Sequence, residues 1–186
     1  MERRPPYSGG SRKLALAFDV GTTFSGISYC ILDPGEVPII KGVMKFPYQE
    51  VVSGSFKVPS IIWYNAAGEV MEIGAGAVRD GVEQDAEDGQ WSKVEWFKLY
   101  LRPTALGRDE VGEFMQRIPR LPAGKTIIDV FADYFRYLFQ STKTYIEERH
   151  PSGKLLWSSF ESNIEFILSH PNGWEGAQQS QMRQAA

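Results

Sequence analysis

The chain of 186 residues has few of the side chains that bind metals or form disulfides. It contains one cysteine, Cys30, and two histidines, His150 and His170. A single cysteine excludes an internal disulfide, and these three residues cannot form a zinc site or a Cys-x-x-Cys redox pair. Because Cys30 stands in an apolar run, we expect a buried, reduced thiol.

Long apolar runs and an excess of positive charge are also missing. No window approaches the ~20 apolar residues that span a bilayer, and the apolar stretch after Arg3-Arg4 is too short for the core of a signal peptide. The formal net charge of -3 leaves no dominant basic face for nucleic acid. We therefore expect a soluble, cytoplasmic protein that binds neither membranes nor nucleic acids.

The composition that is present is that of a globular domain. Hydrophobic residues make up 42% of the chain and aromatic residues 13%, which argues against overall disorder. The length suits one domain, or one domain with an inserted subdomain. Residues 1–13, rich in proline, glycine and serine, are predicted to be a flexible tail.

Strand patterns dominate the first half of the chain. Three apolar runs with short connections predict an antiparallel meander of strands at 14–20, 26–33 and 37–46. A β-rich segment at 57–64, a turn at Asn65 to Gly68 and a run at 69–73 predict a hairpin.

Helical patterns dominate the second half. Apolar residues recur with the 3.6-residue period over 126–149, and Thr126 with Asp129 resembles a capping box. Because its apolar stripe is wide, this helix is expected to lie flat on a sheet. A strand at 163–169 and a helix from 175 follow. Weaker patterns predict helices at 74–82 and 91–101, the latter ended by Pro103, with a solvated acidic loop at 80–88.

The segment richest in chemistry is Asp19-Val20-Gly21-Thr22-Thr23, directly after the first buried strand. An aspartate there can orient the water shell of a magnesium ion. Glycine lets the backbone approach an anion, and consecutive turn amides with two hydroxyls form an anion-binding concavity. The pattern therefore favours a site for a β,γ-phosphate group, although an ordinary hairpin turn also uses these residue types. It is not a P-loop.

The remaining polar residues carry weaker signals. Lys98 lies in an aromatic segment and could simply extend to solvent. His170, beside Pro171, is typical of a structural turn. The pair Trp96-Phe97 is expected in the core.

Several segments resemble the heat-shock-70-like branch of the actin-like ATPase superfamily. The turn at 19–23 resembles its first phosphate motif, and Val58-Pro59-Ser60 resembles the strand after its meander. The segment 95–101 is similar to the one that carries the catalytic lysine. Residues 167–186, with Pro171-Asn172-Gly173-Trp174, resemble its Val-Pro-Ala-Tyr strand end and following helix. The Pro-Asn-Gly-Trp form of this segment, with the long aromatic helix before it, resembles the divergent A12-type branch, common in fungi, more than the standard chaperones.

This resemblance implies a role for each matched residue. Asp19 would orient the water shell of Mg²⁺, and Gly21, Thr22, Thr23 and Phe24 would hold the phosphates of ATP. Phe24 stands where the family usually has tyrosine. The Lys98 ammonium would lie near the γ-phosphate and the attacking water. Pro171 would belong to a switch that transmits the nucleotide state to a partner domain.

The fold implied is one α/β lobe of an actin-like (ribonuclease H-like) ATPase, here incomplete. Its core would comprise 14–49 and 121–186, with the strand at 163–169 parallel in the meander sheet and an inserted subdomain at 50–120. The family's second phosphate motif, catalytic glutamate and adenosine pocket are not found. We therefore expect the N-terminal part of a nucleotide-binding domain, with weak or no ATP binding and negligible hydrolysis, so whether the chain acts as an enzyme stays open.

Two alternatives remain from the sequence. A sugar or glycerol kinase of the same superfamily also carries the pattern D-x-G-T-[TS]. A non-enzymatic interaction fragment would instead expose apolar surface where a second lobe packs. The expected partners are a nucleotide and either a protein client or that missing lobe.

Overall fold

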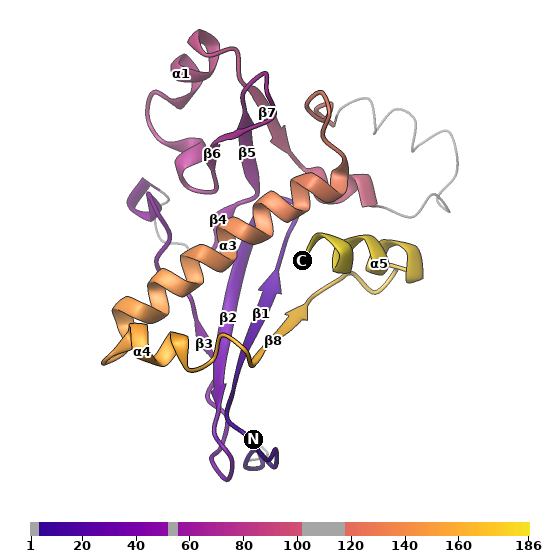
Figure 1. Ribbon diagram of the computed structural model, residues 1–186. Coiled ribbons are helices and arrows are strands. Elements are labelled where there is room, and N and C mark those ends of the chain that lie inside the picture. The colour runs from indigo at the N-terminus through magenta and orange to yellow at the C-terminus, as the bar shows by residue number, and fades with distance from the viewer. Residues whose placement is uncertain (1–3, 52–55, 102–117) are drawn as a thin grey trace.

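The computed structural model describes residues 4–51, 56–101 and 118–186 (Figure 1). It is a mixed α/β structure with two sheets. The larger sheet has the strand order β3-β2-β1-β8, and β4 pairs with β2 beside this path. Its strands are β1 (Lys13–Asp19), β2 (Phe24–Leu32), β3 (Lys41–Gly42), β4 (Val58–Pro59) and β8 (Ile164–Leu168).

The larger sheet is mixed in direction, as predicted. β1 is antiparallel to β2 and parallel to β8, with Phe18 opposite Ile27 on one side and Leu168 on the other. Residues Leu14, Leu16 and Phe18 alternate onto one face and are at most 3% exposed, so this face carries the core.

The smaller sheet has the order β6-β5-β7 and is antiparallel. Its strands are β5 (Ile61–Tyr64), β6 (Val70–Ile73) and β7 (Ser92–Glu95). Short helices flank it, namely η1 (Gln49–Val51), η2 (Gly76–Val78), α1 (Val82–Asp88) and η3 (Phe97–Leu101). This sheet falls within the subdomain predicted at 50–120, whose boundaries remain a prediction.

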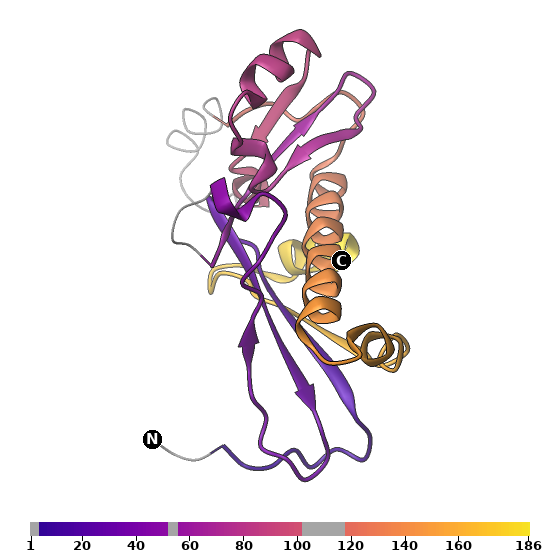
Figure 2. The same ribbon diagram turned by 90° about the vertical axis from the view of Figure 1, so that its left-hand side faces the viewer.

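One long helix, α3 (Ile127–Arg149), runs alongside both sheets (Figure 2). It begins where predicted, since the Thr126 hydroxyl accepts from the Asp129 amide and the Asp129 carboxylate accepts from Thr126. Its aromatic residues interlock with the sheet, for example Phe135 edge-on to Phe18 at 5.6 Å. α4 (Gly153–Ser158) and α5 (Gly176–Ala185) follow.

Several sequence expectations were wrong in detail. The segment 91–101 is strand β7 followed by the 3-10 helix η3, because Trp96 adopts φ 55° between them and β7 pairs with β5. The third strand is reduced to Lys41–Gly42, with one further bond from the Val43 amide to the Ile27 carbonyl. Pro38 supplies no amide for a longer ladder.

The second group of errors concerns short helices. The helix expected at 74–82 is only the 3-10 turn η2, since Gly74 and Gly81 adopt positive φ and interrupt it. The acidic segment expected as a loop is exposed but forms helix α1. Helix α4 was not predicted. Pro103, expected to end the earlier helix, lies outside the described residues.

No helix in the three described ranges is both long enough and apolar enough to cross a membrane. Cys30 is free and buried, as expected.

Candidate functional site

The candidate site is the turn between β1 and β2. Asp19 ends β1 and Phe24 begins β2, with Gly21 at the closest approach of the two arms. A Cβ on Gly21 would lie 2.1 Å from the Phe24 carbonyl oxygen, which is closer than any real contact. Glycine is therefore required here by close packing of the backbone.

Two buried serines hold this turn from below. The Ser60 hydroxyl donates to the Gly21 carbonyl at 2.9 Å, and the Gly21 amide donates to the Ser25 hydroxyl at 3.2 Å. The hydroxyls of Ser25 and Ser60 lie 2.8 Å apart, and Ser25 must donate because the Ser60 proton is already used. Both residues are at most 1% exposed. The backbone of the turn is thus fixed before any ligand arrives.

The two threonines face outward from this support. Thr22 is half-buried and Thr23 is exposed, and the Thr23 carbonyl accepts from the Ser60 amide at 2.8 Å. Within the described part of the chain, neither threonine hydroxyl has a hydrogen-bond partner. Phe24 is 44% exposed and its backbone pairs with Pro59. The turn therefore presents hydroxyls outward while its backbone is anchored inward.

Asp19 is engaged through both carboxylate oxygens. Lys57 Nζ donates to Oδ2 at 2.8 Å, and the Ser169 hydroxyl donates to Oδ1 at 3.0 Å. The hydrogen bond from Lys57 is the main cause that lowers the pKa of Asp19, and Ser169 adds to it against the opposing effect of burial. The carboxylate is therefore ionised at neutral pH and already has a cation beside it.

Lys98 reaches the same turn from η3. Its Nζ donates to the Val20 carbonyl at 2.5 Å, across 78 positions of the sequence. The ammonium also lies 5.7 Å from the centre of the Trp174 ring. Burial lowers the pKa of Lys98, and Lys57 lowers it further, whereas Asp19 opposes the shift. Lys98 is thus held at the turn rather than extended into solvent.

Pro171 lies after β8 and is exposed. Its carbonyl accepts from the Trp174 amide at 3.1 Å and from His170 Nδ1 at 3.0 Å. Because the Trp174 ring lies against the Lys98 ammonium, Pro171 is joined to the turn at 19–23 through two residues, Trp174 and Lys98. The structure therefore brings Asp19, the turn and Lys98 together, whereas Pro171 is connected to them only through Trp174.

Several residues of this site were missed by the sequence analysis, namely Ser25, Ser60, Lys57, Ser169 and Trp174. The segment Val58-Pro59-Ser60 was predicted to be a strand, but no local pattern indicated that the Ser60 hydroxyl would donate to the Gly21 carbonyl. Lys57 and Ser169 carried no signal, because they approach Asp19 only through the pairing of β4 and β8 with the sheet.

The donor set fits an anion better than a directly bound metal. Among the described residues, no group of three or more His, Cys, Asp or Glu could hold a metal ion. Asp19 is the one carboxylate at the turn, and a metal approaching Oδ2 would have to displace Lys57. A phosphate would instead meet the ammonium groups of Lys57 and Lys98 and the hydroxyls of Thr22 and Thr23.

A cavity of about 280 Å³ opens beside Asp19 on the sheet face opposite α3. Small residues of the strands form its floor, and Lys57 and Ser169 lie on its walls. The residues that line it are Ala17, Phe18, Asp19, Gly26, Ile27, Ser28, Gly42, Val43, Phe56, Lys57, Ile167 and Ser169. The Lys57–Asp19 ion pair is therefore accessible to a small polar ligand.

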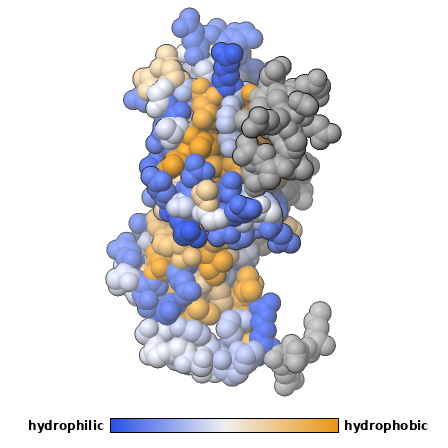
Figure 3. All heavy atoms as spheres, turned by 90° about the vertical axis from the view of Figure 1, so that its right-hand side faces the viewer, coloured by the Kyte–Doolittle hydropathy of each residue, from blue (hydrophilic) through white to orange (hydrophobic). Residues whose placement is uncertain are grey.

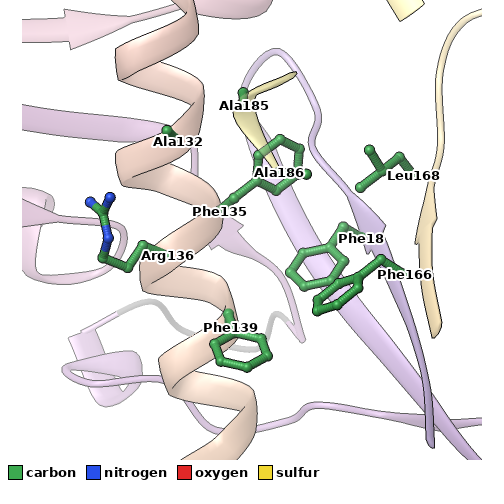
Figure 4. A pocket seen from close by; sticks show the side chains of 9 residues that line it. All are labelled: Phe18, Ala132, Phe135, Arg136, Phe139, Phe166, Leu168, Ala185 and Ala186. Atoms are coloured by element: carbon green, nitrogen blue, oxygen red, sulfur yellow. The ribbon is translucent and has the colours of Figure 1, made fainter. Parts of the chain in front are cut away.

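A second, apolar pocket of about 260 Å³ lies on the α3 side of the sheet (Figure 4). It is bordered by Phe139 from α3, Phe166 and Leu168 from β8, and the chain end at Ala185 and Ala186. Among the strands of the described ranges, β8 lies at the edge of this sheet, and Phe166 and Ile167 are each 50% exposed. Figure 3 shows apolar atoms gathered between polar ones on the side of the molecule that carries β8 and α5.

Comparison of the sequence with protein-family models and with curated protein sequences gives no match.

Proposed function

We propose that the turn at 19–23 binds the phosphate tail of ATP, as the first phosphate-binding wall of a heat-shock-70-like, actin-like ATPase fold. The observation that carries the proposal is the hydrogen bond from Lys98 Nζ to the Val20 carbonyl. It brings an ammonium from a distant segment onto a glycine turn that already suits an anion. In a full-length protein this site would serve ATP hydrolysis coupled to conformational change.

The arrangement of elements also supports the proposal. An antiparallel β1-β2-β3 unit, a crossing helix α3 and a strand β8 parallel to β1 agree with the lobe that the resemblance implies. Asp19 and Lys98 both lie at the carboxyl end of β1, where open α/β sheets bind ligands.

The chemical role of each group follows from charge. The Thr22 and Thr23 hydroxyls would donate to phosphate oxygens, while Lys98 would stabilise the negative charge of the terminal phosphate. Its burial among Trp174 and the turn strengthens that interaction relative to water. Magnesium, which the resemblance implies, would enter bound to the ATP phosphates, since Asp19 is already paired with Lys57.

The test is a titration of isotope-labelled protein with Mg-ATP followed by amide NMR. We expect the amide signals of Gly21, Thr22 and Thr23 to shift, with a dissociation constant of about 1 mM, which corresponds to about −4 kcal/mol. Lys98→Ala should weaken binding about tenfold, the lower end for one charge-assisted hydrogen bond. Lys154→Ala removes the same charge from exposed α4 and should change nothing.

Shifts confined to residues away from the turn, or equal affinity in the two lysine variants, would overturn the phosphate assignment. ATP turnover that is abolished by Lys98→Ala would show that the site is catalytic without any partner, against our expectation.

A protein-binding role is the second candidate, favoured by the exposed apolar side chains of β8. An outer strand with free backbone groups is a ready template for another strand. A purified protein that binds no hydrophobic dye would count against this role.

A further inference from the structure

Lys57 reaches Asp19 because of the strand register. Asp19 is paired with Gly26 across β1 and β2, and Ser25 is paired with Val58 across β2 and β4. Lys57, just before Val58, therefore lies beside Gly26 on one side of β2, and Asp19 lies beside Gly26 on the other side. Gly26 has no side chain, and the Lys57 stem passes beside it, with Cγ 3.5 Å from where a Cβ on Gly26 would be.

The resulting ion pair occupies the position that a cation would take at this carboxylate. Lys57 Nζ lies 2.8 Å from Asp19 Oδ2, while Oδ1 is held by Ser169. A metal ion that displaced Lys57 would also come close to the Lys98 ammonium, which is near enough to interact electrostatically with both Asp19 and Lys57. Two positive groups thus already face one negative group, and together they carry one net positive charge.

The pair is exposed enough to rearrange when a ligand binds. The Lys57 and Asp19 side chains are 51% and 53% exposed, and both line the cavity beside the turn. A lysine ammonium has three donor hydrogens, so it can bind Asp19 and a phosphate oxygen at once. An exposed pair of this kind contributes little to folding stability, so stability alone does not explain its placement.

We propose that Lys57 is a second phosphate-binding ammonium that takes the place of the divalent cation at Asp19, so that this site binds polyphosphates without requiring magnesium. This rests on the proposed phosphate-binding function and adds a residue and a cation requirement to it. Polyphosphate sites usually rely on Mg²⁺ to neutralise the bridging oxygens. Here Lys57 and Lys98 supply that charge from the chain itself.

The experiment measures the affinity of the whole chain for ATP and for inorganic triphosphate by amide NMR, in excess EDTA and in excess magnesium at constant ionic strength. We expect the wild-type affinities in the two conditions to differ by less than about threefold. Lys57→Gln should lose about tenfold in EDTA and recover most of this loss in magnesium. Lys57→Arg, which keeps the charge, should resemble the wild type.

Matched controls separate this effect from a loss of folding or of charge in general. Lys154→Gln makes the same change on exposed α4 and should leave both affinities unaltered. The amide spectrum of Lys57→Gln without ligand should match that of the wild type outside the neighbourhood of Asp19.

The outcomes distinguish the two proposals. Wild-type binding of either ligand that needs magnesium, or equal magnesium dependence in wild type and Lys57→Gln, overturns the role of Lys57 and leaves the phosphate site intact. A Lys57-dependent response to triphosphate without any response to ATP supports Lys57 and refutes the nucleotide. No response to either ligand, with or without magnesium, refutes both.

Discussion

The two serines beneath the turn give the sharpest test of how the site is built. Ser60→Ala removes the bond to the Gly21 carbonyl at 2.9 Å and the bond from Ser25 at 2.8 Å. At about 1 kcal/mol for each net hydrogen bond, the free energy of unfolding should fall by about 2 kcal/mol. Ser25→Ala also removes two bonds and should cost a similar amount.

The double variant decides whether these bonds form one unit. The Ser25–Ser60 bond is lost in either single variant, so it is counted twice when the two effects are added. The double variant should therefore be about 1 kcal/mol more stable than the sum of the single effects implies. This positive coupling is the expected signature of a shared hydrogen bond.

Urea unfolding followed by tryptophan fluorescence measures these free energies, and hydrogen exchange of the Gly21 amide reports the turn directly. Ser162→Ala, an exposed turn position, is the control and should change stability by less than about 0.5 kcal/mol. If Ser60→Ala has an effect as small as the control, or if the two serine effects add fully, the hydroxyls do not support the turn as described.

Three further outcomes follow from the contacts described. Gly21→Ala should destabilise the protein by about 1–3 kcal/mol and abolish the phosphate response, because its Cβ would lie 2.1 Å from a backbone carbonyl oxygen; Gly42→Ala, with open space around it, is the control for urea unfolding. Burial lowers the pKa of His150, so the unfolded chain binds a proton at a higher pH than the folded chain does. The urea concentration at the unfolding midpoint should therefore decrease as the pH is lowered through about 6.5. The decrease should be smaller in His150→Gln. Ile167→Lys should reduce hydrophobic-dye binding and self-association, whereas Leu155→Lys at a more exposed helical position should not.

The features predicted well from the sequence are those with a local physical cause. Helix 126–149 has its apolar stripe and its own cap, and the structure begins it after Thr126. The parallel strand at 163–169 could be predicted because a long helix between two strands returns the chain to the same edge.

The failures have a common cause in tertiary pairing. Residues 92–95 lie in a segment whose flanking aromatic residues suggested a helix. They instead form a strand, because they pair with β5 from Ile61 to Tyr64. Backbone conformation then changes at Trp96, whose positive φ no local pattern indicates. Pairing with a distant strand overrides a weak local preference.

The same division applies to the site. The glycine turn is contiguous in sequence, so the tight turn between β1 and β2 could be predicted from residue types alone. Lys57 and Ser60 could not be placed, because their positions depend on the pairing of Val58 and Pro59 with β2. A five-residue motif therefore locates the turn and omits most of the groups that set its charge and rigidity.

The two lysines at the turn also connect it to the smaller sheet. Lys57 precedes β4, which leads directly into β5, while Lys98 follows β7, so the two ammonium groups lie at the two ends of the segment that forms this sheet. Lys57 donates to Asp19 at the end of β1, in the larger sheet, and Lys98 donates to the Val20 carbonyl just after it. A rotation of the smaller sheet against the larger one would therefore shift both ammonium groups relative to the turn. A phosphate held between them would, in turn, favour one relative orientation of the two sheets, because it gains from both charges only when both are in place.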